Sequence, residues 1–162
     1  MTNYILLLQV LLCAVVSDVK TKKIPNVLCI YGIFVSLVYW LLVDKGALLH
    51  KLVPGMCIPF CMLFFLYAIR VLGAGDVKLM CVVGTYIGMD IIGVIGLTFA
   101  ITALYGVMIY VRRIRCAVRQ GGSDTRRVLE HFFEFNTGIC FSIPIFFAVL
   151  IYLLKEACVG GI

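Results

Sequence analysis

Six runs of apolar residues, separated by short polar or basic segments, form the pattern of this chain. The runs cover roughly residues 4–17, 27–43, 52–72, 77–92, 93–111 and 138–155. A helix that crosses a bilayer needs about 20 mostly apolar residues, with a range of about 17–25. The pattern therefore predicts an all-α, polytopic membrane bundle of about six transmembrane helices, folded as one domain over residues 1–162.

Two features of this pattern allow another interpretation. The segment 88–93 is barely polar, so the runs on either side of it are alternatively one tilted or broken helix, which gives a count of five. The first run is alternatively a cleaved signal peptide. However, no Lys or Arg precedes it and no clear small-x-small cleavage pattern follows it, so we expect a retained first helix.

The composition supports a membrane protein. Hydrophobic residues make up 64% of the chain and charged residues 14%, and the mean hydropathy is +1.14. Soluble domains contain about 25% charged residues, so a soluble class is excluded.

The basic residues predict the orientation of the helices. Lys and Arg accumulate in short cytoplasmic connections, and of the 14 basic residues only Lys45, Lys51 and Lys155 lie outside one set of alternate connections. We therefore expect both termini outside the cell. The net charge of +6 favours contact with anionic membrane lipids. Nucleic acid is not an expected partner, because most of the arginines lie in one short connection without a recognisable binding module.

The connection at residues 112–137 is the largest polar segment, and we expect it to be a basic cytoplasmic loop. Its second half, residues 126–135, alternates aromatic and aliphatic residues with charged ones, which is typical of an amphipathic helix in the headgroup plane. The segment either anchors the protein or flanks the path of a membrane-bound substrate.

The eight cysteines do not predict a metal site or a cofactor. Six of them lie within apolar runs, and the chain contains no C-x-x-C pair. Free cysteine is a good small apolar residue. We therefore expect packing roles for them, and no cofactor or metal.

Two acidic residues stand in unusual surroundings. Asp18 closes the first apolar run, and Asp76 follows Gly73-Ala74-Gly75 at the start of the fourth run. An ionisable residue at membrane depth is costly and is a candidate functional residue. In the structural alternative, Asp18 ends a helix and pairs with Lys22, while Asp76 caps the next helix.

Two neighbouring carboxylates can hydrolyse a peptide bond without a metal. Like charges in a low dielectric cannot both ionise, so the pair shares one proton and supplies both a base and an acid. We expect Asp18 and Asp76 on neighbouring helices at the cytoplasmic boundary, facing a common water-accessible cleft. Gly73 and Gly75 would permit close approach of the backbone.

Small residues farther along the same helices predict close packing. Gly84 and Gly88 form a small-xxx-small element, and Ala14 lies four residues before Asp18. These residues are expected to draw the helices that carry Asp18 and Asp76 together.

Lys78 lies two positions after Asp76, so it points to a different side of a helix. We expect its ammonium group to reach the cytoplasmic interface rather than to form the main ion pair with Asp76.

The two aspartates belong to longer motifs that resemble those of a known family. The chain reads Asp18-Val19-Lys20-Thr21-Lys22-Lys23-Ile24-Pro25-Asn26, then Gly73-Ala74-Gly75-Asp76-Val77-Lys78-Leu79, then Ser142-Ile143-Pro144 in a final helix. This combination resembles the type IV prepilin peptidases, which are membrane aspartic proteases with a G-x-G-D motif.

The resemblance implies an aspartic endopeptidase in the plasma (inner) membrane. Its catalytic residues would be Asp18 and Asp76, and its substrate a type IV pilin-like precursor that loses a short basic leader after a Gly at the cytoplasmic face. The resemblance also implies that the neighbouring motif residues support the site, namely Gly73, Gly75, Lys78, Lys20, Pro25 and Asn26.

One departure from the family concerns methyl transfer. Larger relatives carry a cytoplasmic domain with two C-x-x-C pairs between the first two helices, associated with N-methylation of the trimmed pilin. Only the eight residues 19–26 occupy that place here. The chain therefore resembles the short, peptidase-only form, and N-methyltransferase activity is not expected.

Two other functions use the same two carboxylates in a helical bundle. One is a small proton-coupled transporter, and the other is a non-catalytic membrane assembly factor. Many transporters contain internal repeats, and none is detected between the two halves of this sequence.

Overall fold

The computed structural model describes residues 2–21, 24–43, 46, 48–69, 72–119 and 141–159, and every element in these ranges is helical. The α-helices are α1 (Thr2–Thr21), α2 (Asn26–Val43), α4 (Val53–Ala68), α5 (Ala74–Ile87), α6 (Ile91–Arg119) and α8 (Ser142–Val159). Two short helical turns accompany them, η1 (Leu48–Leu52) and η2 (Gly88–Asp90). The expectation of an all-α fold is confirmed.

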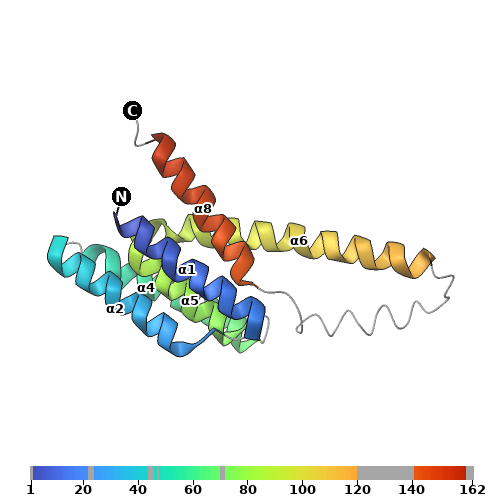
Figure 1. Ribbon diagram of the computed structural model, residues 1–162, viewed down its shortest axis with the longest axis horizontal. Helices are drawn as coiled ribbons and strands as arrows, with labels where there is room; N and C mark the ends of the chain where they lie inside the picture. Colours follow the sequence, from blue (N-terminus) through green and yellow to red (C-terminus); the bar gives the residue numbers. More distant parts are fainter. Residues whose placement is uncertain are drawn as a thin grey trace.

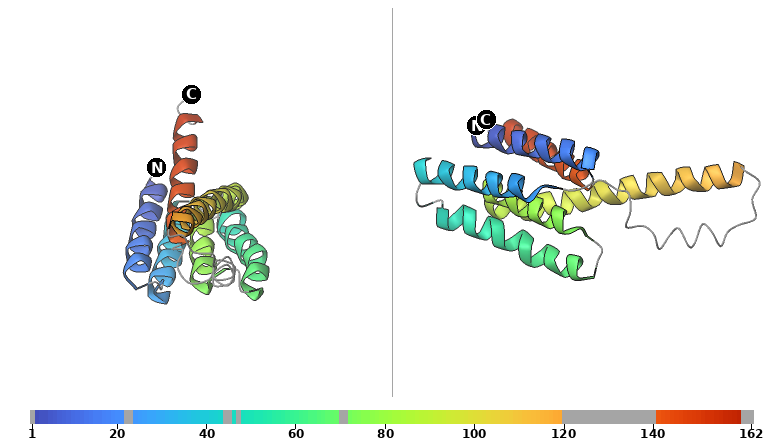
Figure 2. Two further views of the ribbon diagram at one scale, coloured as in Figure 1. Left: turned by 90° about the vertical axis from the view of Figure 1, so that its right-hand side faces the viewer. Right: turned by 60° about the horizontal axis from the view of Figure 1, so that its bottom comes forward.

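The helices run up and down, so that consecutive helices point in opposite directions (Figure 1). The end of α1, the start of α5 and the start of α8 lie at one end of the bundle, and the start of α1 and the end of α8 lie at the other (Figure 2). Each of the six apolar runs corresponds to one α-helix.

Four segments are long and apolar enough to cross a membrane: Asn3–Thr21, Asn26–Val43, His50–Ala68 and Ala74–Ile109. The protein therefore has the helices of a multi-pass membrane protein. The last segment, of 36 residues, combines α5 and α6. Six spans, and the compartment in which the termini lie, remain predictions.

The chain bends between α5 and α6 at Gly88. This residue has a φ of +79°, which is the left-handed region that glycine adopts without steric cost. The turn η2 follows, and α6 begins at Ile91. Segment 77–111 is thus broken at the position that the sequence marked only weakly.

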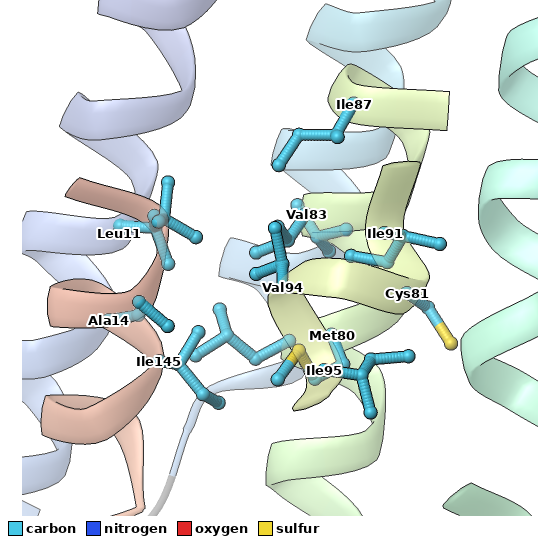
Figure 3. Packing of buried hydrophobic residues seen from close by; sticks show 14 of the residues in the cluster. Leu11, Ala14, Met80, Cys81, Val83, Ile87, Ile91, Val94, Ile95 and Ile145 are labelled. Atoms are coloured by element: carbon cyan, nitrogen blue, oxygen red, sulfur yellow. The ribbon is translucent and has the colours of Figure 1, made fainter. Parts of the chain in front are cut away.

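Helix α5 lies at the centre of the bundle. All residues from Leu79 to Ile87 are buried, and α5 contacts α1, α2, α4, α6 and α8. Its apolar side chains, among them Met80 and Val83, meet those of α6 and of the α1–α8 pair (Figure 3). A helix that is apolar on all sides suits either the centre of a bundle or the lipid, and α5 occupies the centre.

Glycines bring α4 and α5 into direct backbone contact. A Cβ atom on Gly84 would overlap the main-chain oxygen of Gly55, and a Cβ atom on Gly55 would overlap that of Gly84. Pro59, one turn farther along α4, lies 3.2 Å from the Cβ position of Gly84. The small-residue element of α5 therefore packs on α4, and the expectation that it draws α5 toward α1 is wrong.

Hydrogen bonds also join α1 and α2 to α5. Ser36 Oγ and Trp40 Nε1 both donate to the main-chain oxygen of Thr85, each at 3.0 Å. Tyr86 Oη donates to the Gly32 oxygen at 2.9 Å, and Asn3 Nδ2 donates to the Tyr86 oxygen at 3.2 Å. Such bonds between helices stabilise bundles in lipid, where the hydrophobic effect between helices is lost.

Helix α6 extends past the rest of the bundle, at the end where α1 stops and α5 begins (Figures 1 and 2). It continues to Arg119, so the first eight residues of the expected loop 112–137 are helical. Arg112 and Arg115 are exposed on this extension. The amphipathic segment 126–135 lies outside the described residues.

Candidate active site

The buried face of α1 places Asp18 inside the bundle. Asn3, Leu7, Leu11, Ala14 and Asp18 are buried at spacings of three or four residues, which is one stripe of a helix. Asp18 is 8% exposed. The acid thus occupies a position in the stripe that is apolar one turn earlier, at Ala14.

Asp76 lies in the first turn of α5, where Gly73 is the N-cap residue. The main chain of Gly73 hydrogen-bonds the Asp76 carboxylate, and the Asp76 N–H donates to the Gly73 oxygen at 3.1 Å. The Asp76 side chain therefore reaches back to the N-cap residue, as the acidic residue of a capping box does. A negative charge at this position also stabilises the N-terminus of the helix. Asp76 thus caps α5, as the structural alternative expects. Its side chain is half-buried, so capping does not remove it completely from solvent.

Glycine at position 73 allows this arrangement. A Cβ atom there would lie 2.9 Å from Asp76 Oδ2, closer than side-chain contacts allow without movement. The Cβ position of Gly75 lies 3.5 Å from Ile24, which is an ordinary contact. Of the two positions, only a side chain added at 73 would disturb the Asp76 carboxylate.

The structure brings Asp18 and Asp76 together at one end of the bundle. The helices α1 and α5 contact each other, and the two acids are close enough for their charges to interact. The residues are 58 positions apart in the sequence. The structural alternative pairs Asp18 with Lys22. Lys22 lies outside the described residues.

The third side chain at this end comes from α8. The hydroxyl of Ser142 donates a short hydrogen bond to Asp18 Oδ2, and Ser142 is fully buried. Sequence reasoning did not pair these residues, which are 124 positions apart. The signal for such a partner was present, because an acid in phase with Leu7, Leu11 and Ala14 is buried and needs a hydrogen-bond donor.

Lys78 contacts the first residue of α2 instead of Asp76. Its Nζ donates to Asn26 Oδ1 at 2.9 Å, while Ile24 packs near Gly75. The expectation that Lys78 does not form the main ion pair with Asp76 is confirmed, and that its ammonium group reaches the membrane interface remains a prediction. Lys20 and Pro25 are both exposed.

The Lys78–Asn26 bond gives a prediction about the site. Lys78→Ala and Asn26→Ala should each reduce the catalytic rate about 3- to 10-fold, because a hydrogen bond of about 0.5–1.5 kcal/mol holds the 24–26 segment beside α5. The double variant should be no slower than the slower single variant. Rate losses that multiply in the double variant would show that the two side chains act separately.

A lateral groove lies between α1 and α2. It has a volume of about 380 Å³ and an apolar lining to which α1 contributes residues between Leu6 and Cys13, and α2 contributes Leu28, Tyr31 and Val35. Neither aspartate lines this groove. A water-accessible cleft shared by both acids therefore remains a prediction.

The fold and this site define a class: a multi-pass helical membrane protein with two interacting carboxylates at one end of the bundle. A family model described as the Type IV leader peptidase family matches residues 5–111, which is more than half of the 162 residues. The chain belongs to this family and is a membrane peptidase of the leader-peptidase type. No curated protein and no solved structure gave a significant match.

The family match includes both aspartates and ends within α6. It confirms the sequence resemblance. Helix α8, with Ser142, lies beyond the matched residues.

Proposed function

We propose that the protein is an aspartic endopeptidase that removes the short basic leader from type IV pilin-like precursors at the cytoplasmic face of the membrane. The observation that carries the proposal is that Asp18 and Asp76, two acids from contacting helices within the matched region, lie close enough for their charges to interact. The family supplies the reaction class, and the two acids supply groups that can perform it.

In the proposed mechanism the two carboxylates hold one proton between them. The ionised one takes a proton from water as the water oxygen attacks the scissile carbonyl carbon. The protonated one donates its proton to the carbonyl oxygen, which gives a neutral tetrahedral intermediate. Collapse of this intermediate breaks the C–N bond, and the leaving nitrogen receives the proton that the base had taken. The other carboxylate takes a proton from one of the two hydroxyls as the new carbonyl forms, so the pair again holds one proton.

The basic residues support a cytoplasmic position for the site. Lys20, Arg112 and Arg115 are exposed at the aspartate end of the bundle, and positive charge accumulates on the cytoplasmic side of membrane proteins. A basic leader would meet these charges unfavourably, so its recognition would depend on the acids of the site and on anionic lipid.

The direct test is cleavage by the purified protein in lipid–detergent micelles. The substrate is a pilin-like precursor with a basic leader, a Gly at the junction and an apolar helix after it. Mass spectrometry should show a single new N-terminus directly after the Gly, and a precursor with Gly→Leu at the junction should remain intact. An unprocessed precursor would overturn the protease proposal and favour a non-catalytic assembly role. Proton uptake by liposomes containing the protein would instead favour the transporter.

Chelation is expected to leave the rate unchanged. In the proposed mechanism the carboxylates activate the water, so no step depends on a metal ion. Cleavage rates should agree, within error, before and after dialysis against EDTA. A loss of activity that added Zn²⁺ or Mg²⁺ restores would contradict the two-aspartate mechanism.

A further inference from the structure

We infer that Ser142 is a positioning residue for Asp18, and that α8 is therefore part of the active site. The inference concerns a residue beyond the part of the chain that the family model matches, which ends at residue 111. Its catalytic part rests on the proposed protease function. The contact itself is a property of the fold, and the experiments below separate the two.

The first argument is the burial of the acid. Asp18 and Ser142 are 8% and 0% exposed, and the Ser142 hydroxyl donates to Asp18 Oδ2. A carboxylate removed from water is strongly destabilising unless donors surround it. Ser142 supplies such a donor at a position where the adjacent turns of α1 and α8 present Ala14 and Ile145, which are both apolar.

The second argument is that packing fixes the position of the hydroxyl. Ala14 and Leu11 of α1 lie beside Ile145 of α8 (Figure 3), one helical turn from the Asp18–Ser142 contact. On the other side, the Phe141 ring meets the Phe99 ring of α6 edge-on, with centroids 5.9 Å apart. The residue before Ser142 and the residue one turn after it are thus both anchored, so the hydroxyl is held in place before substrate binds.

The third argument is what the bond does for the reaction. Because Oδ2 is held by Ser142, the side-chain torsions of Asp18 are fixed, and with them the direction of Oδ1. A fixed Oδ1 would meet the attacking water and Asp76 of the proposed mechanism in a constant geometry. Misplacement of a reacting group by about 1 Å can cost about 100-fold in rate, so a donor that fixes the carboxylate acts mainly on kcat.

Ser36 provides a matched control. It is as buried as Ser142, and its hydroxyl also makes one hydrogen bond between helices, to the Thr85 oxygen at 3.0 Å. Its acceptor is the main chain rather than an acid. Ser36→Ala thus measures the cost of deleting a buried hydroxyl from this bundle without touching Asp18.

The first experiment compares steady-state cleavage by Ser142→Ala, Ser142→Thr and Ser36→Ala. We expect Ser142→Ala to lower kcat about 10- to 100-fold with KM changed less than about 3-fold. Ser142→Thr retains the hydroxyl and should recover most of the lost kcat. Ser36→Ala should keep kcat near wild type. Full kcat in Ser142→Ala, or equal losses in the two Ala variants, would overturn the positioning role.

The second experiment does not use activity. The Tm shift of Ser142→Ala is measured in the wild type and in an Asp18→Ala background. If the bond exists, the shift should be much smaller when Asp18 is already removed, whereas the shift of Ser36→Ala should be the same in both backgrounds. Equal shifts of Ser142→Ala in the two backgrounds would overturn the contact. A wild-type protein that cleaves no precursor would overturn the proposed function, while this cycle would still decide the contact.

Discussion

Replacement of either Asp18 or Asp76 by Asn is expected to abolish leader cleavage. Each acid performs a different half of the proposed proton transfer, and the loss of one member of such a unit costs nearly the whole catalytic effect. We expect kcat to fall by about 10³-fold or more in each single variant, and the double variant to be no slower than either. The measurement is precursor cleavage followed by mass spectrometry over long incubations.

The folded state of these variants should be preserved. Asn has the shape of Asp, and at position 18 its side-chain oxygen can still accept the hydrogen bond from the Ser142 hydroxyl. The matched control is Asp90→Asn, because Asp90 is an exposed acid in η2 that accepts a hydrogen bond from Tyr152 at 3.2 Å. It should cleave at the wild-type rate. Substantial turnover by Asp18→Asn or Asp76→Asn would remove that residue from the mechanism.

The second large effect is expected at the contact of α4 with α5. Gly84→Ala places a methyl group on the main-chain oxygen of Gly55, a backbone atom that cannot move aside as a side chain can. The two helices must separate, and overpacking of this kind costs about 1–3 kcal/mol or more. We expect a clearly lower Tm in detergent and a loss of activity at elevated temperature.

Gly96→Ala is the control for this prediction. Gly96 lies in α6, and a Cβ atom there meets nothing within 4 Å. The same substitution in an open helical position stabilises by about 0.5–1 kcal/mol, because glycine loses more conformational freedom on folding than alanine. A Tm for Gly84→Ala at or above that of Gly96→Ala would show that the close backbone contact is absent.

The sequence was sufficient to predict the helices. The length and composition of each apolar run depend on the bilayer that the helix must cross, whichever helices pack beside it. The ends of the helices were predicted less well. The run 52–72 ends as a helix at Ala68, and α6 continues to Arg119 instead of stopping near residue 111. Arg favours helix almost as much as Leu does, so charge marks the edge of the membrane without ending the helix.

The neighbours of each helix could not be predicted in the same way. Gly84 and Gly88 indicate that some backbone comes close, but the motif does not identify which one, and the partner is Gly55 of α4 rather than α1. The position of Lys78 relative to Asp76 follows from helical geometry alone and was correct. Its partner Asn26 was not foreseeable, because that contact depends on how the 24–26 segment folds back against α5.

The contact between α1 and α8 also imposes an order on the assembly of the protein. A membrane chain is made from its N-terminus, so Asp18 and Asp76 are both synthesised before half of the 162 residues are complete. The hydroxyl that satisfies Asp18 belongs to α8, the most C-terminal of the described helices. Until that helix is inserted, Asp18 is an acid without its donor, and α1 has no apolar surface to meet Leu11 and Ala14 on that side. The Asp18 part of the site is therefore complete only after α8 has joined α1.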